Sequence, residues 1–95
     1  MALPNFLQPY LASYDLSKMD RERDKKLIIT EILNKGDDIA IGWLGKTYPQ
    51  QEIKEVVASP IRGMWLSSVL VYWLKIFDIK LPNDIFKKAI INLAP

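Results

Sequence analysis

Prolines, glycines and helix-capping residues divide this chain into short segments, and in most of them the apolar residues recur at helical spacing. One uninterrupted apolar run, residues 69–74, is long enough for a strand. It has no hairpin partner, however, and its neighbours are helical, so we interpret it as helix. We therefore predict an all-α fold, a compact single domain of five or six short helices. Within residues 1–95 we expect an aromatic-rich N-terminal arm over 1–19 and a helical core over 20–95.

Capping residues predict where the helices begin and end. Asp20, Asp37 and Asn83 each precede a segment with helical periodicity and are good N-caps. Pro49 suits the first position of a helix, and Gly36 is a natural stop after the first long segment. The predicted helices cover about 21–34, 38–47, 49–58, 64–77 and 84–93.

The chain contains no histidine and no cysteine, which restricts its chemistry. Without cysteine there are no disulfides, thiolate nucleophiles or cysteine-ligated zinc sites. Without histidine the commonest general base and metal ligand are missing, and the usual Ser-His and Cys-His dyads cannot form. No glycine-rich phosphate loop and no serine-nucleophile motif replaces them. We therefore expect no catalytic residues, no metal and no cofactor, and a protein that is not an enzyme.

Two acidic stretches carry the residue types of a metal or acid–base site. Residues 20–31 place acids at four positions of a calcium loop, but Lys25 occupies the position that requires glycine, and further basic residues interleave. Asp37 and Asp38 are adjacent and do not share a helix face. Helix caps and solvated first turns explain both stretches better.

The net charge of +2 is too small to indicate a nucleic-acid or membrane partner. The charge-free stretch over 63–74 is shorter than the roughly 20 residues that a membrane span needs. The first residues lack the basic and apolar regions of a signal peptide. We expect a cytoplasmic protein without membrane association.

Residues 39–58 resemble a helix-turn-helix in outline, with two short helices that meet near Pro49. Trp43 falls where such units carry a small residue, and the second helix presents acids as well as bases. A plain helical hairpin explains these residues better than a DNA-binding unit does. If DNA is bound, the candidate contacts are Gln50, Gln51, Lys54, Lys87 and Lys88.

The predicted helix over 64–77 is apolar nearly all round. It is either the central helix of the domain or a helix with one face toward another chain, and the two roles can coexist. Trp and Tyr are favoured anchors of protein interfaces. The candidate interface consists of Trp65, Leu66, Val69, Tyr72 and Trp73.

Several motifs resemble a family of short bacterial proteins described by a domain of unknown function. The motifs are Leu3 to Tyr10, Ser13 to Lys18, Asp24 to Ile29, Ile32 to Asn34 with Gly36, Trp43-Leu44, Thr47-Tyr48, Glu52 to Val57 and Trp73 to Phe77. Together they cover about residues 3–80. The chain departs from the pattern at 66–71, which is more apolar, and at Pro49, where a capping serine is common.

Members of that family are often encoded beside nucleotidyltransferase toxins of the AbiEii type. The resemblance therefore implies a non-enzymatic protein-binding module, an antitoxin-like or accessory partner of a nucleotidyltransferase-like toxin. Self-association is a second possible use of the same surface. The alternative function is that of a helix-turn-helix DNA-binding transcriptional regulator.

Overall fold

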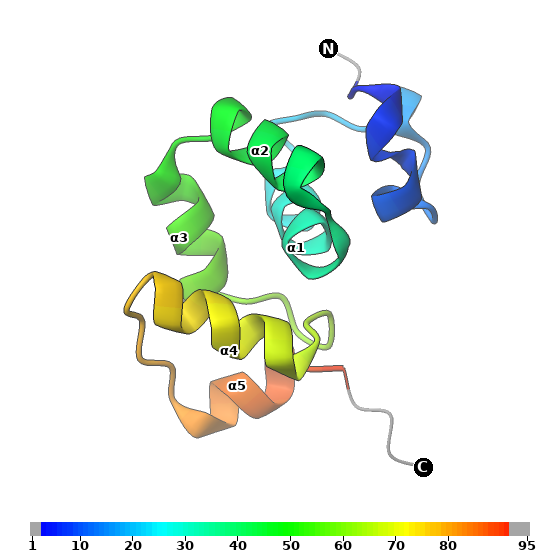
Figure 1. Ribbon diagram of the computed structural model, residues 1–95. Helices are drawn as coiled ribbons and strands as arrows, with labels where there is room; N and C mark the ends of the chain where they lie inside the picture. Colours follow the sequence, from blue (N-terminus) through cyan, green and yellow to red (C-terminus); the bar gives the residue numbers. More distant parts are fainter. Residues whose placement is uncertain (1–2, 92–95) are drawn as a thin grey trace.

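Helix α1 (Lys25–Lys35) is the central element of the computed structural model, which describes residues 3–91 (Figure 1). Its residues from Ile28 to Leu33 are all buried, because η1, α2, α3 and α4 contact it from different sides. The all-α prediction is confirmed for the described residues. The other elements are η1 (Asn5–Leu11), η2 (Leu16–Lys18), α2 (Asp38–Thr47), α3 (Gln50–Ala58), α4 (Ser67–Ile76) and α5 (Asn83–Ala89).

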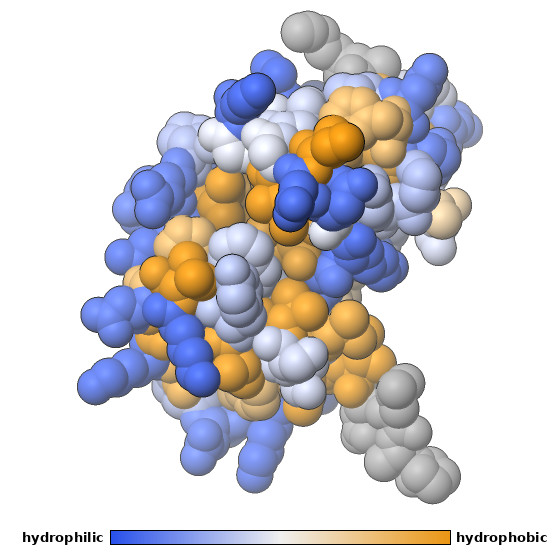
Figure 2. Space-filling model, viewed as in Figure 1, coloured by the Kyte–Doolittle hydropathy of each residue, from blue (hydrophilic) through white to orange (hydrophobic). Residues whose placement is uncertain are grey.

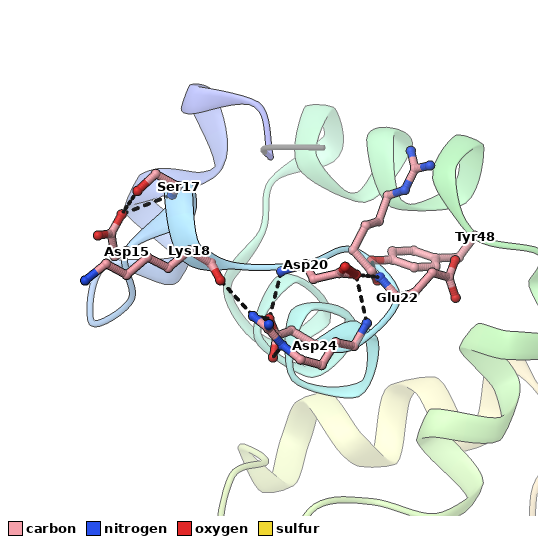
Figure 3. A network of polar contacts seen from close by, with 9 residues as sticks. Asp15, Ser17, Lys18, Asp20, Glu22, Asp24 and Tyr48 are labelled. Atoms are coloured by element: carbon pink, nitrogen blue, oxygen red, sulfur yellow. Dashed lines mark hydrogen bonds and ion pairs between the residues drawn. The ribbon is translucent and has the colours of Figure 1, made fainter.

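Asp20 caps a turn that leads into α1, whereas the sequence predicted it as the N-cap of the helix itself (Figure 3). Its Oδ1 accepts hydrogen bonds from the backbone N–H groups of Glu22 (2.8 Å) and Arg23 (3.0 Å). The Asp24 carboxylate accepts from the backbone N–H of Asp20 and from the guanidinium of Arg23. The regular helix begins at Lys25, later than predicted, because this capped turn occupies the residues between. The carboxylates of Asp20 and Asp24 thus accept hydrogen bonds from backbone N–H groups, as capping residues do.

The turn between α1 and α2 is set by Gly36 and Asp37. A Cβ at Gly36 would lie 2.6 Å from the carbonyl oxygen of Ile32. A side chain at position 36 would therefore clash with the last turn of α1, and the turn requires glycine. The Asp37 carboxylate accepts a hydrogen bond from the N–H of Ala40 (2.9 Å), which caps α2 as predicted. That bond, with the hydroxyl of Tyr10 beside it, lowers the pKa of Asp37 below its usual value.

The N-terminal segment packs against α1 through leucines. Leu7 and Leu11 of η1 are fully buried and belong to the same hydrophobic core as α1. The aromatic side chains of this segment lie nearer the surface, and Phe6 is 45% exposed. This segment therefore contributes buried side chains to the domain.

The segment around Trp65 is extended, where the sequence predicted the start of a helix over 64–77. The N–H of Trp65 donates to the carbonyl of Ala89 (3.0 Å), and the N–H of Ile91 donates to the carbonyl of Trp65 (2.8 Å). This pairing delays α4 to Ser67 and ends α5 at Ala89. The prediction that the last helix continues to 93 is therefore wrong at 90, and its final residues lie outside the described part of the chain.

Candidate protein-binding groove

Helix α4 packs against α1 and α3, and α5 lies on its other side in Figure 1. Among its residues only Leu70 is buried, whereas Tyr72 and Ile76 are each 56% exposed. The central position belongs to α1, so the explanation of this apolar helix as the central one is wrong. An apolar helix whose large side chains are half exposed is unusual, because burial of such surface favours folding.

An apolar depression runs between α2 and α4. It consists of two adjoining hollows of about 340 Å³ and 420 Å³, which share Leu33, Ile41 and Trp73. Figure 2 shows apolar side chains gathered on this face of the molecule, along α4 and between α4 and α2. We call this depression the α2–α4 groove. It is lined by Leu33, Asp38, Ile41, Leu44, Gly45, Gln50, Ile53, Ser68, Val69, Tyr72, Trp73, Ile76 and Phe77.

One stripe of α4 forms a wall of the groove. Val69, Tyr72, Trp73 and Ile76 follow one another at intervals of three, one and three residues, which places them on one face of a helix. The Trp73 ring packs edge-to-face against Tyr72, with centroids 5.1 Å apart, and stacks on Phe77 at 5.9 Å. Such contacts restrict the aromatic rings, so the wall presents a largely preformed surface.

The opposite wall is formed by the face of α2 that does not enter the core. Ala40, Leu44 and Tyr48 are buried, although Leu44 also borders the groove, whereas Ile41 is half-buried and Gly45 is exposed, and both line the groove. A Cβ built on Gly45 would meet nothing within 4 Å, and the same holds for Gly42. These glycines therefore serve no close contact with the described part of this chain. Because Gly45 has no side chain, the α2 wall of the groove projects less at this position.

Tyr48 fixes the end of α2 relative to the start of α1. Its hydroxyl donates a hydrogen bond to the carbonyl of Arg21 (2.8 Å), and its ring packs edge-to-face against Trp43 at 6.2 Å. Burial raises the pKa of Tyr48 to about 12, because the phenolate would lose its hydration. The wall formed by α2 is thus held in place at its C-terminal end.

The structure places the five predicted interface residues differently. Val69, Tyr72 and Trp73 line the groove, and Leu66 is 42% exposed just before α4. Trp65 is fully buried in the hydrophobic core, so we remove it from the contact surface.

The sequence reasoning omitted several residues that line the groove. Ile76 stands on the same helical stripe as Val69 and Tyr72 and could have been included from its spacing. Ile41 could not have been assigned, because only the packing of α2 shows which of its two faces is buried. The omitted residues also include Gly45 and Phe77.

The candidate DNA contacts do not form one surface. Gln50 lines the α2–α4 groove, and the amide of Gln51 donates to Glu55 on the same helix (3.4 Å). Lys87 and Lys88 line a different hollow, which belongs to α5. Lys54 is exposed on α3. The helix-turn-helix hypothesis stays a prediction.

The described residues show neither a metal centre nor a membrane span. Among residues 3–91 no group of three acidic side chains is placed to hold a metal ion. No helix in this range is both long and apolar enough to cross a bilayer. The groove is therefore the most distinctive candidate site on the described surface.

The sequence profile of a family of unknown function, DUF6922, matches residues 8–57, slightly more than half of the chain. The match runs from within η1 to the last turn of α3 and does not include α4 or α5. The α2 wall of the groove thus lies inside the matched range and the α4 wall outside it. No curated protein and no solved structure shows significant similarity to the chain.

Proposed function

The chain belongs to the DUF6922 family of unknown function, and from that premise we propose that it is a non-enzymatic protein-binding module. In this proposal the α2–α4 groove receives an amphipathic helix of a partner protein. The observation that carries it is the exposure of α4, on which Tyr72 and Ile76 are each 56% exposed along one apolar stripe. Grooves between two helices are a common way to bind such a helix.

The chemistry of the groove supports an apolar ligand. Its lining carries one side chain that is charged at neutral pH, Asp38, at the α2 N-terminus, and the rest is apolar or uncharged. Tyr and Trp are the residue types most often found among binding hot spots, and Tyr72 and Trp73 lie side by side in this wall. A partner helix with apolar anchors three and four residues apart fits this lining.

We propose a nucleotidyltransferase-like toxin as the partner, with this protein as its antitoxin-like or accessory partner in the cytoplasm. The support for this choice is the resemblance of the chain to proteins encoded beside such toxins. The absence of histidine and cysteine from the sequence also favours binding over catalysis. A second copy of the chain is the competing occupant, and solution mass distinguishes the two.

The test compares two isoleucines of similar exposure that differ in position. Ile76 lines the groove, whereas Ile39 on α2 is 71% exposed and lines no described hollow. We expect Ile76→Gln to weaken capture of the toxin by about 2 kcal/mol, or roughly thirtyfold in Kd. Ile39→Gln should leave Kd unchanged. Calorimetry with the purified toxin measures both, after ultracentrifugation has established the mass of the free protein.

The possible outcomes test the contact surface and the identity of the partner separately. Equal affinity of the Ile76→Gln variant and the wild type would show that the groove is not the contact surface. Absence of toxin binding by the wild type would exclude this partner. A concentration-dependent dimer that Ile76→Gln dissociates would instead assign the groove to a second copy of the chain.

A further inference from the structure

Three basic side chains line one hollow between the loop after α3 and helix α5. Arg62, Lys87 and Lys88 surround a volume of about 440 Å³, together with Gly63, Asp84 and Ile90. None of these residues lines the α2–α4 groove. We call this second site the basic hollow.

Backbone hydrogen bonds fix the two segments that form the basic hollow. The N–H of Gly63 donates to the carbonyl of Lys88 (2.8 Å), and the N–H of Trp65 donates to the carbonyl of Ala89 (3.0 Å). Trp65 and Ala89 are both buried, so this junction is anchored in the core. Gly63 has a φ of 73°, a conformation that favours glycine and sets the direction of the chain after Arg62. The cations are therefore presented by a well-supported scaffold.

The charges around the basic hollow are not balanced. Within residues 3–91 neither Arg62 nor the two lysines form an ion pair, whereas Arg23, Lys25 and Lys35 all do. Three cations and the one carboxylate of Asp84 leave a formal charge of +2 in the lining. Like charges held near one another repel, and a bound anion removes that repulsion.

The position of Arg62 argues for a ligand beyond helix stabilisation. Lys87 and Lys88 lie in the last turn of α5, where cations also interact favourably with the helix dipole. Arg62 belongs to no helix, so a position in the last turn of α5 does not account for its place beside the two lysines. Its guanidinium presents several N–H donors in a planar arrangement that matches the oxygens of a phosphate.

We propose that the basic hollow binds a phosphate group. Arg62 supplies the directional hydrogen bonds and the two lysines supply charge, so that a doubly charged phosphate matches the +2 lining. The phosphate belongs either to a small ligand such as pyrophosphate or to a nucleic-acid backbone. Because the hollow and the groove share no lining residue, this site does not depend on the protein-binding function proposed above.

The test uses the full chain with two probes, inorganic pyrophosphate in calorimetry and a labelled DNA duplex in fluorescence anisotropy, both at low ionic strength. We expect Arg62→Gln and Lys88→Gln each to raise Kd about tenfold or more, since each removes a charge-assisted interaction. Lys18→Gln removes the same charge from an exposed residue of η2, outside the basic hollow and the candidate DNA contacts, and should leave Kd unchanged. Added salt should weaken binding of either probe.

Each result decides for or against the basic hollow. Loss of pyrophosphate binding in Arg62→Gln assigns the site to small phosphates, and a loss seen only with the duplex assigns it to nucleic acid. Equal weakening by Lys18→Gln, or no binding of either probe by the wild type, overturns the proposal. Thermal unfolding of each variant serves as the control for folding. If Arg62→Gln unfolds, the comparison of Lys88→Gln with Lys18→Gln still decides.

Discussion

The two glycines of α2 allow the groove to be tested with almost identical substitutions. Gly42 and Gly45 are both exposed within the same helix, and an added Cβ would meet nothing within 4 Å at either position. Gly45 lines the groove, whereas Gly42 lines no described hollow. Replacing each by alanine therefore makes the same chemical change at two sites that differ only in their relation to the groove.

Both substitutions should stabilise the free protein. Glycine in a helix interior is less favourable than alanine by about 1 kcal/mol. The main reason is that an unfolded chain with alanine at this position has less conformational entropy to lose on folding than one with glycine. No contact in the structure opposes the added methyl group at either site. For a domain of this size, 1 kcal/mol raises Tm by about 4–8 °C. The two substitutions are expected to add, because the added methyl groups share no partner.

Only Gly45→Ala should affect binding. A methyl group forced into a closely packed contact costs about 1–3 kcal/mol, which corresponds to a rise in Kd of roughly five- to 150-fold. Gly42→Ala should bind the partner as the wild type does. Circular dichroism in urea and by heating measures stability, and calorimetry with the partner measures Kd.

Two results would refute this reasoning. A loss of stability in either variant would mean that the space above α2 is occupied in the free protein. Equal binding by Gly45→Ala and Gly42→Ala would mean that the partner does not approach the α2 wall. The predicted combination for Gly45→Ala, a more stable protein with weaker binding, is expected only if the partner occupies the groove.

Three further substitutions test the fold around the groove. Gly36→Ala should destabilise the protein by at least about 1 kcal/mol in urea unfolding, because its Cβ would lie 2.6 Å from the Ile32 carbonyl oxygen. Unchanged stability would show that the α1–α2 turn relaxes freely. Trp65→Ala should cost about 3–5 kcal/mol, as expected for a buried indole, and a loss near zero would contradict its burial. Tyr48→Phe should cost about 1 kcal/mol for the lost bond to Arg21. The raised pKa of Tyr48 predicts that its share of stability is present below pH 10 and is lost toward pH 12. An alkaline titration monitored by circular dichroism should therefore show a weaker pH dependence in Tyr48→Phe, and an identical one would refute this assignment.

The site was predictable to the extent that it depends on spacing within one helix. Val69, Tyr72 and Trp73 were chosen from the sequence as apolar residues of one helix, and they line the groove. Trp65 belongs to the same periodic pattern, but its backbone pairs with residues near 90, far away in the sequence. Periodicity describes which residues share a face, and it does not reveal that a distant segment turns one of them out of the helix.

The sequence alone determined the all-α class and most of the helix boundaries near caps. Asp20, Asp37 and Gly36 act through atoms a few residues away, so their effects are local and readable. Only the tertiary structure decided which helix is central. The apolar content of α4 favoured that helix, yet α1 occupies the centre, since four elements contact it and enclose even Thr30 and Glu31. Burial depends on what surrounds a residue, and that is a property of the whole packed chain. For the same reason the groove, which exists only because α2 and α4 leave apolar surface uncovered between them, follows from packing and from no single segment.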